Sequence, residues 1–130
     1  MNRSVSFLIC FISYVIAFAV AFLFIQKFEG TTNLLLLTFL ADVIATLVIY
    51  VFSVSFKNAS LYDPYWSVAP VFIVLCWKLL LVNSFVVDFM FIAILFWSVR
   101  LTFNWVRGWK GLNHEDWRYK MLREKNPKTY

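Results

Sequence analysis

The side chains best suited to contact a polar ligand or cofactor lie in one segment, residues 100–119 (RLTFNWVRGWKGLNHEDWRY). Mostly apolar residues precede this segment, and charged residues, Trp and Gly arrive in it together. Carboxylates and guanidinium groups bind polar partners through charge-assisted hydrogen bonds. We therefore expect any soluble ligand or cofactor to contact the chain in this segment.

A second polar segment, residues 60–66 (SLYDPYW), offers an acidic partner for Arg100. Asp63 is expected at a similar depth to Arg100, so that an Asp–Arg pair would hold the loop against a late helix. Pro64 ends any helix in the loop and favours an extended backbone at Asp63. The aromatic residues nearby are Tyr65, Trp66, Trp105 and Trp109. They would form either an aromatic belt at the membrane interface or part of a binding site.

Three further ionisable residues, Asp42, Lys78 and Asp88, lie inside apolar runs. A charge in such a run is costly unless it faces protein or water. Lys78 can pair with Asp42 or with Asp88, or it can extend towards the membrane surface alone. We expect a structural ion pair, and the alternative is a polar ligand or proton path.

The composition predicts the elements that must position these residues. The chain is 62% hydrophobic and only 15% charged, which is more apolar surface than a soluble domain of this size can bury. Apolar runs cover about residues 5–25, 34–56, 67–82 and 85–105. A spanning helix needs ~20 residues, which the third run approaches only by including Tyr65 and Trp66. We predict an all-α integral membrane helical bundle with four transmembrane helices in a single domain, residues 1–130, and three helices as the alternative.

The first apolar run is predicted to be a retained membrane anchor. Arg3 and the small residues around Ala21 are compatible with a signal peptide and its cleavage site. The apolar part of a signal peptide is ~7–15 residues long, however, and this run is longer.

Basic residues predict the orientation of the chain. With four spans, the N-terminus, the loop at 57–66 and the basic tail at 106–130 lie on one side. The basic residues of that side are Arg3, Lys57, Arg107, Lys110, Arg118, Lys120, Arg123, Lys125 and Lys128, and the other side has only Lys27. The positive-inside rule therefore places both termini in the cytoplasm. The net charge of +5 reflects this topology and a tail suited to anionic lipid headgroups, not to nucleic acid.

No motif for a metal or a nucleotide phosphate is present in the sequence. Cys10 and Cys76 lie in apolar runs without a CxxC partner, and we expect both to be buried as small hydrophobic residues. The chain has one His and no Gly-rich phosphate loop, so we expect no metal site made by this protein alone. A channel or transporter is the least supported class, because Pro70 is the only Gly or Pro within the four runs, whereas transporter sites typically have such interruptions in paired spans.

The tail predicts one short helix lying on the membrane surface. Asn113 is a suitable N-cap, with Asp116 at the third helical position. Asp116 and Lys120 have the spacing of a helical ion pair. The apolar residues of the helix are Trp117, Met121 and Leu122. They would lie on the headgroups while the basic residues face water or lipid phosphate.

Three ordered elements, residues 63–66 (DPYW), 97–101 (WSVRL) and 115–119 (EDWRY), resemble the steroid 5-alpha-reductase-like superfamily. Within it, the chain resembles the bacterial branch of uncharacterised membrane proteins, which implies the bacterial inner membrane as the location. The resemblance extends from Asp63 to Tyr119, and the upstream spans match the same topology.

The resemblance implies a multi-span reductase that transfers a hydride from NADPH to a carbon–carbon double bond conjugated to a carbonyl in a lipophilic small molecule. NADPH would enter from the cytosol. The implied catalytic residues are Tyr65, which would donate to the carbonyl, with Asp63 and Arg100 shaping the cytosolic mouth. The residues implied to contact the cofactor are Glu115, Asp116, Arg118 and Tyr119.

The chain also departs from the family pattern. Family members carry a second half, with a run similar to R-H-P-N-Y and further spans, that holds most of the cofactor, and Trp97 stands where their catalytic Tyr is expected. One hypothesis is the N-terminal half of a reductase that acts with a second membrane polypeptide or as a homo-oligomer. The other is a non-catalytic membrane protein that binds lipid or a partner. Only the first predicts stabilisation by NADPH once the partner is present.

Overall fold

The chain folds into helices joined by short connections. The computed structural model describes residues 2–31, 33–80 and 85–125, and these contain no strand. The elements are α1 (Arg3–Phe28), α2 (Leu34–Ser55), the short 3₁₀ helix η1 (Ala59–Leu61), α3 (Tyr65–Leu80), α4 (Phe85–Gly108) and α5 (Trp117–Lys125). Four helical segments are long and apolar enough to cross a membrane, the third when counted as Ala59–Leu80. The predicted all-α class, with four apolar helices and a further helix in the tail, is therefore confirmed.

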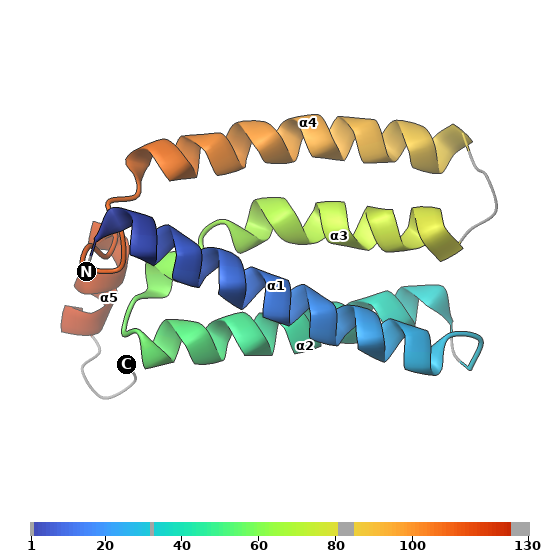
Figure 1. Cartoon of the computed structure of the whole chain (residues 1–130), viewed down its shortest axis with the longest axis horizontal. Coiled ribbons are helices and arrows are strands. Elements are labelled where there is room, and N and C mark those ends of the chain that lie inside the picture. Colours follow the sequence, from blue (N-terminus) through green and yellow to red (C-terminus); the bar gives the residue numbers. More distant parts are fainter. Residues whose placement is uncertain (1, 32, 81–84, 126–130) are drawn as a thin grey trace.

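The four long helices form two antiparallel hairpins (Figure 1). Helix α1 packs along α2, and α3 packs along α4, while α2 also contacts η1 and α3. The beginning of α1, η1, the end of α4 and α5 gather at one end of the molecule (Figure 1). We call this the tail end, and the opposite end, where α3 ends and α4 begins, the far end.

Small side chains allow α1 and α2 to pack closely. The buried small residues recur at intervals of three or four: Ser6, Cys10, Ser13, Ala17 and Ala21 on α1, and Ala41 and Ala45 on α2. Helices in a membrane gain little from burying apolar area against each other, so close backbone approach over small residues is what holds them together. The spacing of the Ala residues is compatible with close packing of α1 on α2, whereas Ser6 on the same helix accepts from the backbone N–H of Leu112 in the tail.

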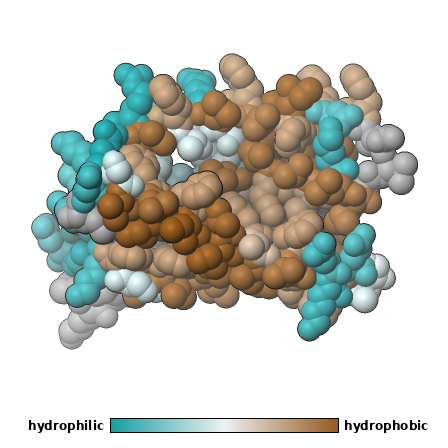
Figure 2. All heavy atoms as spheres, viewed as in Figure 1, coloured by the Kyte–Doolittle hydropathy of each residue, from teal (hydrophilic) through white to brown (hydrophobic). Residues whose placement is uncertain are grey.

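Large apolar side chains cover the outside of the bundle. Figure 2 shows apolar residues over the middle of the molecule and hydrophilic residues at both ends. Among the four long helices, α4 is the least enclosed, because only its Val87 and Ser98 are buried. This pattern is the one expected of a protein whose helices face lipid.

The third helix begins at Tyr65, so it includes both aromatic residues that the short apolar run needed. At the far end, Lys78 forms an ion pair with Asp88, which joins α3 to α4. Asp42, the alternative partner of Lys78, instead accepts a hydrogen bond from the hydroxyl of Tyr65 at 2.8 Å. Of the two predicted pairs, Lys78 with Asp88 is confirmed and Lys78 with Asp42 is wrong.

Candidate ligand-binding site

The connection between α2 and α3 is anchored to the tail by one buried amide. The side chain of Asn58 is 1% exposed. Its Nδ2 donates to the carbonyl oxygens of Leu112 (2.8 Å) and His114 (3.2 Å), while its Oδ1 accepts from the backbone N–H of Ser60 (3.0 Å). A buried amide that satisfies three backbone groups at once keeps the two segments in one arrangement.

Glu115 fixes the same junction from the other side. Its carboxylate is 7% exposed and accepts from the backbone N–H of Ala59 at 3.0 Å and from Arg123 at 3.1 Å. The next residue, Asp116, donates its backbone N–H to the hydroxyl of Ser60 at 2.9 Å. Residue 115 was predicted to contact a cofactor, but in the structure its carboxylate is occupied with η1 and α5.

Arg3, at the beginning of α1, caps the carbonyl groups at the end of α4. Arg3 donates to the carbonyl oxygens of Val106 (2.7 Å) and Trp109 (3.1 Å), which are among the carbonyl groups left unpaired where a helix ends. Gly111 has a φ of +102°, and a Cβ there would lie 2.9 Å from the hydroxyl oxygen of Ser6. The backbone can therefore turn sharply past α1 only because residue 111 is Gly.

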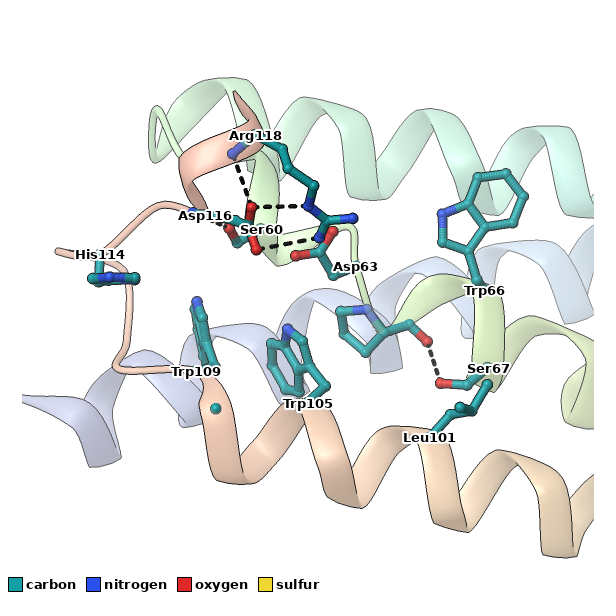
Figure 3. Close-up of a pocket in the computed structure, with 12 residues that line it drawn as sticks. Ser60, Asp63, Trp66, Ser67, Leu101, Trp105, Trp109, His114, Asp116 and Arg118 are labelled. Atoms are coloured by element: carbon teal, nitrogen blue, oxygen red, sulfur yellow. Dashed lines mark hydrogen bonds and ion pairs between the residues drawn. The ribbon is translucent and has the colours of Figure 1, made fainter. Parts of the chain in front are cut away.

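A partly open cavity of about 410 Å³ lies between these anchored segments and is bordered by η1, the beginning of α3, the last turns of α4 and the tail. It is lined by Ser60, Asp63, Pro64, Trp66, Ser67, Leu101, Trp105, Gly108, Trp109, His114, Asp116 and Arg118. Figure 3 shows the acidic residues and Arg118 on one side and the indole rings of α4 on the other. The volume is within the range of small-molecule sites.

Two carboxylates face this cavity, and each already has a partner. Asp116 binds the guanidinium of Arg118 through both oxygens, at 2.9 and 3.2 Å, and caps α5 by accepting the backbone N–H of Arg118. The side-chain and backbone hydrogen bonds from Arg118 lower the pKa of Asp116, while the bond to Asp116 raises that of the guanidinium. Asp63 accepts from the hydroxyl of Tyr119 at 2.5 Å. Burial, followed by the bond to Asp63, raises the pKa of Tyr119.

These contacts correct the prediction for the tail helix. Helix α5 begins at Trp117, three residues after the predicted start, and its N-cap is Asp116, not Asn113. The carboxylate of Asp116 pairs with Arg118 rather than Lys120. The prediction placed Asp116 inside the first turn, and it missed that the long-range bonds of residues 112–116 prevent a helix from starting there.

The predicted pair between Asp63 and Arg100 is also wrong. None of the ion pairs formed by the described residues joins these two side chains, and Arg100 is exposed on α4. Tyr65 does not line the polar cavity either, because its ring is 3% exposed and its hydroxyl is bound to Asp42 inside the bundle. Asp63, Asp116 and Arg118 are thus brought together at the cavity, whereas Tyr65 and Arg100 are not among its lining residues.

Of the tryptophans predicted to lie in a belt or a binding site, Trp109 is buried and Trp105 is partly buried against the core. Trp109 is only 4% exposed, and its ring stacks on that of Trp105 with centroids 4.6 Å apart. Trp66 is 68% exposed and remains compatible with a place at an interface. The spacing of four residues between Trp105 and Trp109 signals that they share one face of α4. Ser60 and His114 lie in the two polar segments singled out from the sequence, but neither they nor Ser67 were predicted individually to line the cavity.

An apolar groove of about 540 Å³ adjoins the polar cavity. It is lined by Phe7, Cys10, Phe11, Tyr14, Val15, Phe18, Pro64, Val68, Thr102 and Trp105, from α1, the beginning of α3 and α4. Pro64 and Trp105 line both the groove and the cavity. A ligand with one polar end and one apolar end can therefore contact both surfaces at once.

Comparison with known proteins gives one family. The family model described as a protein of unknown function, DUF1295, matches residues 49–130. The search of curated proteins and the search of solved structures each gave no match. The matched region contains the polar cavity and all of the tail that the structure describes.

Proposed function

This chain belongs to the DUF1295 family of proteins of unknown function, and from that premise we propose that it binds a lipophilic small molecule as part of a steroid 5-alpha-reductase-like membrane protein. The three elements that resemble this superfamily, at residues 63–66, 97–101 and 115–119, all fall inside the matched region. Two of them, the first and the third, supply Asp63, Asp116 and Arg118 to the cavity.

The observation that carries this proposal is that the polar cavity and the apolar groove share lining residues. Trp105 and Pro64 line both the cavity, which has carboxylates and a guanidinium, and the groove, which is lined almost entirely by carbon. Sites for small molecules are typically apolar, with a few polar groups that orient the ligand. A lipophilic molecule that lies in the groove would present its polar end to the chamber at the tail end.

NADPH fits the described cavity only in part. The indole rings can accommodate a planar heterocycle, because aromatic faces stack. The phosphates do not fit, since the charged side chains of the lining are Asp63, Asp116 and one guanidinium that is already paired with Asp116. Binding of this cofactor would need additional basic groups, from a second membrane polypeptide or a second copy of the chain.

That partial fit favours a second candidate function, a non-catalytic membrane protein that binds a lipid or a partner protein. It would use the same groove and would have no need of NADPH. Both candidates share the proposed topology, in which the tail end faces the cytoplasm of the bacterial inner membrane. The beginning of α1, the connection after α2 and α5 all lie at this end (Figure 1). They carry Arg3, Lys57 and the basic residues of α5, which supports the orientation by the positive-inside rule.

The test is a thermal-unfolding assay on the full chain in lipid nanodiscs, with NADPH and with a long-chain alkyl cyclohexenone. The assay is run on the chain alone and after co-expression with any membrane protein encoded beside it. The reductase proposal expects stabilisation by the cyclohexenone in both preparations, and stabilisation by NADPH with consumption of the cyclohexenone in the co-expressed one. Stabilisation by the cyclohexenone without any effect of NADPH would contradict the reductase proposal and support the non-catalytic function. No effect of either compound would contradict the proposed binding of a lipophilic small molecule.

A matched pair of variants tests whether the stabilisation by ligand arises at the cavity. Asp116→Asn changes a carboxylate of the cavity, whereas Asp88→Asn changes one in an ion pair at the far end. Loss of the ligand effect is expected in Asp116→Asn alone. An equal loss in both variants would assign the effect to general stability and not to the cavity.

A further inference from the structure

Arg100 is a charged side chain in the apolar part of α4 that has no partner among the described residues. It is exposed, and none of the ion pairs formed by the described residues includes its guanidinium. It lies about 12 Å before the end of α4 at Gly108, at 1.5 Å per residue. Because α4 is about 36 Å long and a hydrocarbon layer is about 30 Å thick, this position is well inside the layer. A charge at that depth is costly unless it meets protein or water, so its exposure requires an explanation.

Arg100 belongs to one of two exposed stripes of α4, and the two stripes differ in composition. The apolar stripe contains only large hydrophobic residues: Phe85, Phe89, Ile92, Phe96, Val99 and Phe103. The polar stripe contains Ala93, Trp97, Arg100 and Asn104. In both, the residues recur at intervals of three and four, so each stripe occupies one face of the helix. Figure 1 shows α4 at the edge of the molecule, with α3 along one side of it. The apolar stripe suits lipid, whereas contacts between membrane helices favour small and polar side chains such as those of the polar stripe.

Lipid headgroups do not provide a good partner for Arg100. Long basic side chains near a helix end can extend to the membrane surface. Side chains on a helix lean towards its N-terminus, however, and α4 begins at the far end. Arg100 would have to extend against this direction to reach headgroups at the tail end. An acidic group at its own depth forms a charge-assisted hydrogen bond without that extension.

The described acidic residues of the chain do not supply this group. Those within and between the spans already have partners: Asp42 with Tyr65, Asp63 with Tyr119, and Asp88 with Lys78. Glu29 follows the end of α1 at the far end, and Glu124 lies on α5 at the tail end. The acid therefore has to come from another molecule.

A second copy of the chain is a poor occupant of the polar stripe. Two copies in one membrane have the same orientation, so a two-fold contact through this stripe places each residue beside its own equivalent. Arg100 of one copy would then face Arg100 of the other, and like charges repel strongly where the dielectric constant is low. A different protein that brings an Asp or Glu side chain meets the guanidinium with the opposite charge.

We propose that the polar stripe of α4 docks a membrane helix of a different protein, whose Asp or Glu side chain pairs with Arg100 inside the bilayer. Asn104, one turn nearer the tail end, can form a hydrogen bond across the same contact. Ala93, towards the far end, allows the two backbones to approach closely. The proposed reductase needs a second polypeptide or a second copy of the chain. This inference rests on that proposal only for the membrane location of α4, and it selects a second polypeptide and states the chemistry of its contact.

The test uses designed membrane helices as probes. Full-length protein is placed in phosphatidylcholine nanodiscs with a Leu/Ala helix of ~20 residues that carries one Glu at the depth of Arg100. Three further probes carry Gln or Leu at that position, or the Glu two turns nearer the far end. Association is measured by energy transfer between dyes on the probe and on the protein. NADPH and the cyclohexenone are absent, so a failure here leaves the proposed ligand binding unchanged.

The Glu probe is expected to associate about tenfold to a hundredfold more tightly than the Leu probe, the effect of one charge-assisted hydrogen bond. The Gln probe and the shifted Glu probe should be weaker than the Glu probe. Arg100→Gln should remove the preference for Glu, and Arg100→Lys should keep part of it because the charge remains. Arg100→Glu should prefer a probe that carries Lys.

The matched control is Arg107→Gln, which removes an exposed basic residue of the same helix two turns nearer the tail end. Its guanidinium lies over the ring of Phe103, and it should not change the association of the Glu probe. If Arg100→Gln fails to fold, the comparison of the Glu probe with the shifted Glu probe on the unmodified protein decides the result.

Equal association of the Glu and Leu probes with the unmodified protein would overturn the inference. Equal losses in Arg100→Gln and Arg107→Gln would assign the effect to the general positive charge of the helix and would also overturn it. Disulfide formation between copies of an Ala93→Cys variant, without any probe, would overturn it in favour of a second copy of the chain.

Discussion

The two ends of the bundle use similar charged groups in different ways. At the far end, Lys78 and Asp88 form one ion pair whose side chains are 44% and 49% exposed. At the tail end, the carboxylate of Glu115 is almost fully buried and binds a backbone N–H as well as Arg123. An exposed pair contributes little to stability, whereas a buried polar group becomes costly once it loses its partners. The comparison indicates that the tail end is built to keep a defined cavity, and the far end only to join two helices.

The largest effect is expected for Asn58→Ala. This change leaves the backbone groups of Ser60, Leu112 and His114 without their buried partner, and each unsatisfied group costs about 1–3 kcal/mol. We expect a total loss of about 2–4 kcal/mol, reduced by water that reaches the loop. Amide hydrogen exchange should accelerate in residues 109–125 and stay unchanged in the far halves of α1 and α2.

A matched control for that result is Asn33→Ala. This change removes the N-cap of α2 at the far end, where the side chain of Asn33 accepts from the backbone N–H of Leu35. The loss should be nearer ~1 kcal/mol and confined to the beginning of α2. Equal losses at Asn58 and Asn33 would contradict the difference between the two ends.

The second effect is expected for Gly111→Ala. The added Cβ would lie 2.9 Å from the Ser6 hydroxyl oxygen at a φ of +102°, and a non-Gly residue in such a conformation costs about 1–3 kcal/mol. Thermal unfolding should detect the loss. Gly108→Ala is the control, since a Cβ there has no atom within 4 Å. A stable Gly111→Ala protein would show that the tail does not pass this close to α1.

A smaller effect, dependent on pH, is expected for Tyr119→Phe. The folded state raises the pKa of Tyr119, so its contribution is fully present below the unfolded pKa of about 10 and is lost as the pH rises through the higher folded value. Docking of α5, followed by a fluorophore attached to residue 122, should weaken above about pH 10. In Tyr119→Phe, docking should be weaker at neutral pH by about 1 kcal/mol and should lack this alkaline step. An alkaline step of equal size in the variant would assign it to another group.

The smallest effect is expected at the far end for Lys78→Met or Asp88→Asn. Exposed ion pairs contribute about 0–1 kcal/mol, so the unfolding temperature should change little, and less still at high salt. The double variant measures the coupling between the two residues. A coupling as large as the Asn58 effect would mean that the pair is buried in the membrane, where screening is absent.

Helix-forming runs and their ends were predictable because they depend on neighbouring residues. The apolar runs located α1, α2 and α4 within a few residues, and the need to include Tyr65 in α3 followed from the length of a membrane span. The pair of Lys78 with Asp88, ten residues further along the chain, was also one of the arrangements predicted for Lys78. The partners of Asp63 and Tyr65 were not predictable. The position of a residue along its helix indicates its depth in the membrane but not which neighbouring helix or loop its side chain reaches. Tyr65 in fact reaches α2 and Asp63 reaches the tail.

The sequence by itself determined that this chain is a set of four long apolar helices with basic residues concentrated at one end, because both properties follow from composition and spacing. Only the tertiary structure decided that residues 109–116 fold back onto η1, which turns Glu115 into an anchor and leaves Asp116 and Arg118 at the cavity. The physical reason is that this loop is held by hydrogen bonds to residues more than fifty positions away. No local pattern in the chain specifies contacts of that range.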